Sequence, residues 1–120
     1  MKTDFEWPTL VMLFATYVIW AIGTTLIVDV SLGLAIAITA VAIAQYSSLQ
    51  HEMIHGHPFR SQKLNALIVF PALLPVIPYQ RFRDQHLAHH KDSDLTDPFD
   101  DPESNYLAPD VWERLPRLLQ

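Results

Sequence analysis

Two short histidine clusters are the residues of this chain best able to do chemistry. The first, HEMIH, contains His51 and His55, and the second, HLAHH, contains His86, His89 and His90. On a helix, residues three or four apart share one face, so each cluster can direct its imidazole rings towards one point. Neutral imidazole is a good ligand for iron, zinc, copper and nickel. The spacing therefore predicts a metal site with these five histidines as ligands.

Composition narrows the kinds of metal site that this chain can form. None of its 120 residues is cysteine, which excludes disulfides, Cys-ligated zinc, iron–sulfur clusters and thiolate-bound haem. A metal would therefore be held by nitrogen and oxygen ligands. The 8 basic and 13 acidic residues give a formal net charge of -5. Because phosphate binding needs a basic stripe, which is missing here, we expect no nucleic-acid partner.

Two long apolar segments precede the first histidine cluster and could anchor it at a membrane. Residues 9–28 carry no charge, and a helix of this length spans about 30 Å, roughly one hydrocarbon core. A second segment, residues 30–48, follows after a tight turn at Asp29. We expect two antiparallel transmembrane helices. A secretory signal peptide is disfavoured because the first segment is long and because Asp4 and Glu6 dilute the positive start.

The distribution of basic residues predicts which side of the membrane carries the histidines. Two spans return the chain to its starting side, so the N-terminus and both clusters would face one compartment. The turn at Asp29 has no basic residue, whereas the other side carries Lys2, Arg60, Lys63, Arg81, Arg83 and Lys91. Basic residues are enriched in cytoplasmic loops, which places the clusters on the cytoplasmic side.

A third apolar stretch, residues 64–79, separates the two clusters and is interrupted by Pro71, Pro75 and Pro78. Proline removes an amide donor and clashes with the preceding helical turn. We therefore expect a broken helical segment in the membrane interface or against the helix pair, and not a third span. The polar residues 80–120 are predicted to form a cytosolic cap with the histidine-bearing helices. The expected fold is an all-α integral membrane protein.

The first cluster alone also matches a different chemistry. HEMIH fits H-E-x-x-H, in which two histidines bind zinc and the glutamate, here Glu52, is the general base of a metalloprotease. A catalytic zinc takes three protein ligands and keeps one position open, whereas this chain offers five clustered imidazoles. The surplus favours two iron ions over one zinc. A membrane zinc protease and a non-catalytic membrane fragment stay as alternatives.

Neighbouring polar residues have less specific roles. His57 lies off the helical face of the first cluster and precedes Pro58, which predicts a loop position. Carboxylates often accept the second ring N–H of a ligand histidine and so fix its orientation. The sequence offers several, most of which we expect to be solvated: Glu52, Asp84, Asp92, Asp94 and Asp97. Arg81 and Arg83 could pair with these acids or contact lipid headgroups.

The whole pattern resembles the membrane fatty acid desaturase family. The resemblance rests on H-x-x-x-H after a second span, a short apolar segment, and RFRDQHLAHH followed by DPFDDPES, and it runs from about Thr9 to the last residue. It implies a dinuclear non-haem iron centre, O2 activation, a fatty acyl substrate in the membrane and an external redox protein as electron donor. The implied iron ligands are His51, His55, His86, His89 and His90.

One motif of that family is missing from the sequence. A third box, another H-x-x-H-H after two further spans, is not found, and the sequence ends with WERLPRLLQ, with no polar tail after it. We therefore expect an N-terminal portion of a desaturase-like domain that is inactive alone.

Cleaving an unactivated C–H bond requires a redox metal and oxygen. Lipid hydroxylases and carotenoid ketolases start with the same hydrogen abstraction, so both stay open as alternatives.

Overall fold

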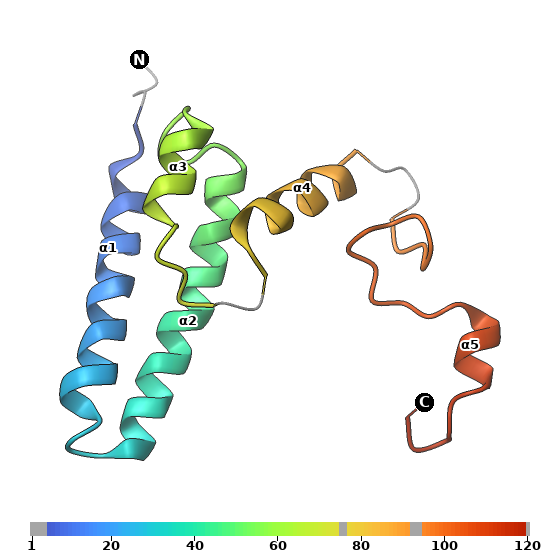
Figure 1. The fold of residues 1–120 in the computed structure, drawn as a ribbon, viewed down its shortest axis with the longest axis horizontal. Helices are drawn as coiled ribbons and strands as arrows, with labels where there is room; N and C mark the ends of the chain where they lie inside the picture. The colour runs from blue at the N-terminus through green and yellow to red at the C-terminus, as the bar shows by residue number, and fades with distance from the viewer. Residues whose placement is uncertain (1–4, 75–76, 92–94, 120) are drawn as a thin grey trace. The chain divides into compact units, whose positions relative to one another are not determined.

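The computed structural model describes residues 5–74, 77–91 and 95–119. Within these ranges the secondary structure is helical, apart from an isolated bridge between Phe5 and Phe59. The chain divides into two compact units, Met1–Gln80 and Arg81–Gln120 (Figure 1). Several residues used in the sequence argument lie outside the described residues: Lys2, Asp4, Pro75, Asp92 and Asp94.

The first unit is built on a helical hairpin. Helix α1, Trp7–Ile22, continues into a short π-helix η1, Gly23–Ile27, and α2, Leu32–Ile54, runs back alongside it (Figure 1). By length and composition, the continuous stretches Trp7–Ile27 and Leu32–Ile54 are both able to cross a membrane. The predicted all-α fold with two such helices is therefore confirmed.

Local sequence explains where the hairpin turns and how closely its helices approach. The Ser31 hydroxyl accepts a hydrogen bond of 3.4 Å from the Leu34 N–H, which caps the start of α2. Gly23 is buried where η1 meets α2, and a Cβ atom there would lie 2.8 Å from the Thr39 hydroxyl. Glycine at this position therefore allows the two backbones to pack closely, as small residues do between membrane helices.

The proline-rich segment packs against this hairpin. Helix α3, Gln62–Ile68, ends before Pro71, in agreement with the expected interruption. Carbonyl groups beyond the last turn then need new donors. The buried Tyr46 hydroxyl donates to the Val69 carbonyl at 2.7 Å, and the Tyr17 hydroxyl lies 3.1 Å from the carbonyl oxygens of Ile68 and Pro71. Such bonds allow irregular backbone to lie against helices in an apolar setting.

An apolar core joins the three helices of the first unit. It consists of buried side chains from both hairpin helices and from the segment after α3: Leu13, Tyr46, Leu49, Met53, Val69 and Leu73. Packing of these side chains places the end of α2, with the first histidine cluster, beside α3. The second unit contains most of α4, Tyr79–His89, followed by a looped stretch and the short α5, Pro109–Glu113.

Candidate metal centre

The first histidine cluster lies at the C-terminal end of α2. His51 is in the last turns of the helix and His55 is its C-cap residue. The centroids of the two rings are 4.8 Å apart. The helix thus continues beyond the predicted span of 30–48, and this continuation brings both rings of HEMIH to the same end of the hairpin.

A glycine defines the point at which α2 stops. Gly56 adopts a φ of 92°, a left-handed conformation that glycine takes without steric cost. The Gly56 N–H donates to the Met53 carbonyl at 3.3 Å, and the His57 N–H donates to the Glu52 carbonyl at 3.2 Å. This pair of bonds is a Schellman motif, which closes many helices with a glycine. The position of His55 is therefore set by the backbone.

Side chains from α3 hold the same helix end. Asn65 is fully buried; its amide nitrogen donates to the carbonyls of Met53 (3.3 Å) and Phe59 (2.8 Å), and its oxygen accepts from the Phe59 N–H (3.1 Å). Gln62 donates to the Ile54 carbonyl at 3.1 Å. The Ile54 carbonyl thus gains a partner that α2 itself cannot supply, and the Met53 carbonyl gains a second bond besides the one from Gly56. The loop after HEMIH is consequently tied to α3.

His57 occupies that loop, as predicted, and is held away from the cluster's helix. Its Nδ1 atom lies 2.9 Å from a carboxylate oxygen of Glu6. Both side chains are substantially exposed, at 40% for His57 and 49% for Glu6. The pair joins the loop to the residue that precedes α1. Nothing in this geometry adds His57 to the set of candidate ligands.

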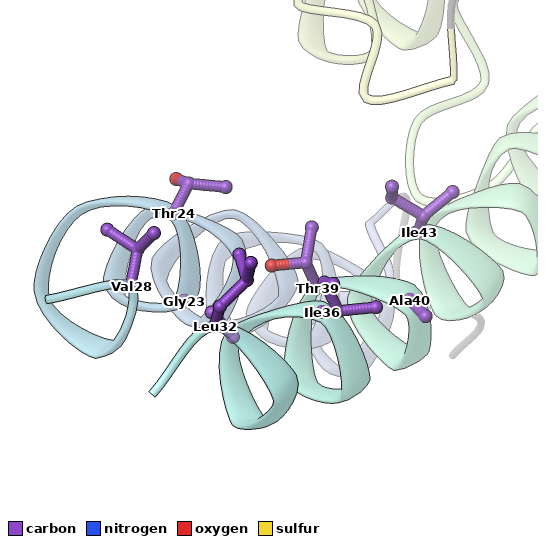
Figure 2. A pocket seen from close by; sticks show the side chains of 9 residues that line it. Gly23, Thr24, Val28, Leu32, Ile36, Thr39, Ala40 and Ile43 are labelled. Carbon is purple, nitrogen blue, oxygen red and sulfur yellow. The ribbon is translucent and has the colours of Figure 1, made fainter. Parts of the chain in front are cut away.

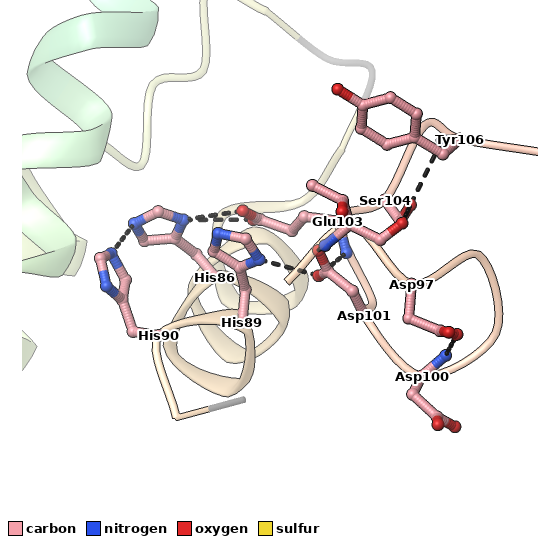
Figure 3. Close-up of polar contacts among 10 residues, drawn as sticks. His86, His89, His90, Asp97, Asp100, Asp101, Glu103, Ser104 and Tyr106 are labelled. Atoms are coloured by element: carbon pink, nitrogen blue, oxygen red, sulfur yellow. Dashed lines mark hydrogen bonds and ion pairs between the residues drawn. The ribbon is translucent and has the colours of Figure 1, made fainter. Parts of the chain in front are cut away.

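The second histidine cluster gathers three rings at the end of α4 (Figure 3). The ring centroid of His86 lies 4.5 Å from that of His90 and 6.2 Å from that of His89. The Nε2 atoms of His86 and His90 are 3.0 Å apart. His86 and His89 belong to the helix and His90 follows its last residue. The expected gathering of these imidazoles within HLAHH is thus present.

Two carboxylates contact the Nδ1 atoms of His86 and His89 (Figure 3). Glu103 places its oxygens 3.0 and 3.2 Å from Nδ1 of His86, and Asp101 places one oxygen 2.8 Å from Nδ1 of His89. An ionised carboxylate only accepts hydrogen bonds, so each ring carries a proton on Nδ1 and, in its neutral form, a lone pair on Nε2. This is the tautomer in which a histidine can bind a metal through Nε2.

The Asp101 carboxylate is kept ionised by its surroundings. The N–H groups of Glu103 and Thr96 each donate to it at 2.9 Å, and His89 bonds to it as well. These bonds, in that order of importance, lower the pKa of Asp101 to about 2. The carboxylate is therefore negatively charged at any physiological pH and remains an acceptor for the ring proton.

The spacing of the rings also suits a metal. Two ligand nitrogens bonded at about 2.1 Å and at a right angle to one ion lie about 3.0 Å apart. This matches the separation of 3.0 Å between the Nε2 atoms of His86 and His90. Because His86 holds its proton on Nδ1, the present contact is a bond donated by His90. If both Nε2 atoms bound one ion, the neutral His90 ring would carry its proton on Nδ1 instead.

Comparison with known proteins identifies the family. The family model for fatty acid desaturases matches residues 29–120, which include both histidine clusters. The chain belongs to the fatty acid desaturase family. No significant match to a curated protein or to a solved structure was found. The resemblance to this family is thus confirmed, and the family supports a desaturase-type oxidoreductase function and implies a lipid substrate and membrane association.

The acids named from the sequence have other contacts in this chain. Asp84 accepts two bonds from its neighbour Arg83, at 2.7 and 2.9 Å. Asp97 accepts from backbone N–H groups two and three residues further along the chain, at 2.8 and 3.0 Å. Glu52 is exposed. Among the described residues of that set, therefore, none was found bonded to a ring of the second box.

Asp101 and Glu103 were missed because sequence spacing does not indicate them. They lie 12 and 17 residues along the chain from their histidine partners. Nothing in DPFDDPES distinguishes one acid from the next as a ring partner. Asp101 precedes a proline, which favours an extended backbone, but that preference alone does not predict the contact.

A second concave region lies at the other end of the hairpin from HEMIH (Figure 2). It is an apolar groove of about 420 Å³ between η1, Val28 in the turn and the first half of α2. Aliphatic side chains form most of it, with the hydroxyls of Thr24 and Thr39 as its polar groups. Of the described residues that line it, none has a titratable side chain. The groove therefore has no means of metal or acid–base chemistry.

Proposed function

We propose that this chain carries the first two histidine boxes of an oxygen-dependent fatty acyl desaturase. In this proposal two iron ions are bound by the imidazoles of His51, His55, His86, His89 and His90. The observation that carries it is the second box, where three rings gather and carboxylates set the lone pairs of two of them on Nε2. The family match over both boxes supports the same assignment.

The iron pair, when bound, would activate O2 so that two hydrogens leave adjacent carbons of an acyl chain and a double bond forms. The reaction balances when O2 takes up these two hydrogens together with two electrons and two protons, giving two water molecules. The electrons would come from a separate redox protein. Glu103 and Asp101 hold the proton on Nδ1 of His86 and His89, so that these rings present neutral Nε2 atoms.

The proposed arrangement places this chemistry at the cytoplasmic surface of a membrane. Residues 9–28 and 30–48 would form two spans, residues 64–79 an interfacial segment and residues 80–120 a cytosolic cap. Candidate spans at these places and the family's membrane association support this arrangement. Its orientation rests on the basic residues outside the Asp29 turn. The acyl chain would then reach the boxes from the bilayer.

Metal content and product analysis together test this function. Purified protein should contain iron and little zinc, and iron should fall when histidines of either box are replaced by alanine. Lipids of cells that express this chain together with the missing third histidine box should gain a double bond, detected by mass spectrometry as a loss of two hydrogens. A new hydroxyl or keto group would instead indicate a hydroxylase or ketolase.

The competing protease is tested by the same preparation. Stoichiometric zinc, together with a peptidase activity that disappears in Glu52→Gln, would contradict the desaturase proposal. Glu52 is exposed on α2, so this substitution should leave the fold intact. Under the desaturase proposal, Glu52→Gln leaves iron content unchanged.

A further inference from the structure

We propose that Asp101 and Glu103 are positioning residues that select Nε2 as the metal-facing nitrogen of His89 and His86. This inference deepens the proposed function and rests on it. Neither acid was assigned a role by the sequence pattern, and neither would itself touch the metal or the substrate. Each acts on the far edge of a ring by holding its proton and its orientation.

Asp101 has the geometry of a fixed acceptor. Its side chain is only 2% exposed, and its nearer oxygen lies 2.8 Å from Nδ1 of His89. The Glu103 N–H donates to the same oxygen and the Thr96 N–H donates to the other, both at 2.9 Å. With both oxygens held by backbone groups, the carboxylate cannot rotate to follow the ring. The ring must instead align with the carboxylate.

The loop that carries Asp101 is closed by a second contact. The Ser104 hydroxyl donates to the Thr96 carbonyl at 3.0 Å, so Thr96 is bonded through both its N–H and its C=O. Thr96 has a φ of 75°, which is unusual for a β-branched residue. Backbone in such a conformation persists where surrounding contacts determine it. The loop is therefore built to keep Asp101 in place.

Glu103 is a weaker version of the same device. Both its oxygens approach Nδ1 of His86, at 3.0 and 3.2 Å, but its side chain is 26% exposed. Water can therefore replace part of its hydrogen bonding when it is removed. His86 itself is well buried, with 7% of its side chain exposed. We expect loss of Glu103 to matter, and loss of Asp101 to matter more.

Removing the carboxylate should change both ring tautomer and metal affinity. Without an acceptor at Nδ1, the His89 ring can move its proton to Nε2 and lose the lone pair that would bind metal. Loss of such a partner lowers metal affinity about 10–100-fold in other sites. Asp101→Asn keeps the shape of the side chain but can no longer hold the ring proton as an anion does.

The test uses the full chain in detergent micelles with Co²⁺ as a spectroscopic probe. Affinity is measured from visible absorption for the unchanged protein, Asp101→Asn and Glu103→Gln. Asp100→Asn is the matched control, because Asp100 is exposed and the substitution removes the same charge one residue away from Asp101. We expect a loss of affinity of about 10–100-fold for Asp101→Asn, less for Glu103→Gln, and none for Asp100→Asn.

A second readout does not depend on metal. In the metal-free protein, ¹⁵N NMR of the histidine rings distinguishes a proton on Nδ1 from one on Nε2. His89 should be the Nδ1–H tautomer in the unchanged protein and in Asp100→Asn, and should shift towards Nε2–H in Asp101→Asn. Circular dichroism checks that helicity is kept. Asp101→Asn is also measured in a His89→Ala background. If Asp101 acts only through the His89 ring, it should not lower the affinity further there. A further loss of affinity would mean that Asp101→Asn unfolds the loop, and would overturn the proposal.

The outcomes separate the two levels of inference. If the unchanged protein binds Co²⁺ while Asp101→Asn has equal affinity and an unchanged His89 tautomer, the positioning role is wrong and the proposed function stands. If the unchanged protein binds neither Co²⁺ nor iron, the proposed function fails, and the positioning role with it, whatever the variants do. Loss of affinity together with the tautomer shift supports the positioning role.

Discussion

The first histidine box is fixed through its backbone, whereas the second is fixed through its rings. At the end of α2, a Schellman motif at Gly56 and the buried Asn65 hold the peptide groups around HEMIH. At the end of α4, Asp101 and Glu103 contact the imidazoles themselves. The comparison shows two ways of preparing a ligand set, and each way can be broken separately.

The largest effect should come from removing the buried amide of the first unit. Asn65→Leu leaves the carbonyl and the N–H of Phe59 without this partner and removes one of the two bonds to the Met53 carbonyl. Each unmet buried group costs about 1–3 kcal/mol, so the free energy of unfolding should fall by about 3 kcal/mol or more. Denaturant titration in detergent measures it. The control Asn105→Leu, at an exposed position, should change the free energy of unfolding little. Equal losses of stability in the two variants would refute the role of Asn65.

The helix-ending glycine gives the next largest effect. Gly56→Ala forces a side chain into a φ of 92° and should destabilise the first unit by about 1–2 kcal/mol. Gly33→Ala is a control of opposite sign, because Gly33 lies within α2 with open space around its Cβ position. It should stabilise the helix by about 0.5–1 kcal/mol. Thermal unfolding followed by circular dichroism measures the change in stability for both variants. If both substitutions stabilise the protein, or both destabilise it, the result counts against the Schellman assignment.

Strong acid should release the Asp101 contact in the second box. The pKa of Asp101 is lowered to about 2, so its stabilising contribution is complete above its usual pKa near 3.8 and is lost as the pH falls through about 2. The Thr96 N–H, which bonds to Asp101, should report this step in an NMR titration from pH 5 downwards. The Thr96 signal should not show this titration step in Asp101→Asn. A midpoint near pH 4 in the unchanged protein would contradict the hydrogen bonds to the Asp101 carboxylate.

The smallest effect should come from the sixth histidine. His57 pairs with Glu6 at 2.9 Å, but both side chains are largely exposed, and exposed pairs contribute about 0–1 kcal/mol. His57→Ala should therefore alter stability by less than about 1 kcal/mol and leave the iron content unchanged. Metal analysis of this variant beside His55→Ala sharpens the boundary of the first box. A loss of iron in His57→Ala would add His57 to the ligand set.

Much of this organisation is predictable because it depends on local pattern. The uncharged run before Asp29 and the apolar run after it predict the two hairpin helices, and Pro71 explains the end of α3. Rings spaced three or four residues apart meet on one helix face, which is why both boxes gather as expected. These features need no knowledge of how distant segments fold back.

The end of α2 and the carboxylate partners of the histidine rings could not be predicted from local sequence pattern. The fading apolar pattern after Ser48 marks where a membrane span would end, but the helix itself runs on to Ile54 and is terminated by the left-handed Gly56. The ring partners Asp101 and Glu103 depend on the path of a loop that no periodic pattern describes. Choosing these two among many acids required the geometry of that loop.

The most direct test of the account is whether the two boxes hold one iron centre. Iron per chain, measured by mass spectrometry with Mössbauer spectroscopy of ⁵⁷Fe-loaded protein, should be compared among the unchanged protein, His51→Ala and His86→Ala. The account predicts a coupled pair of irons in nitrogen-rich surroundings that is lost in both variants. Iron that survives unchanged in either variant, or its replacement by stoichiometric zinc in the unchanged protein, would contradict it.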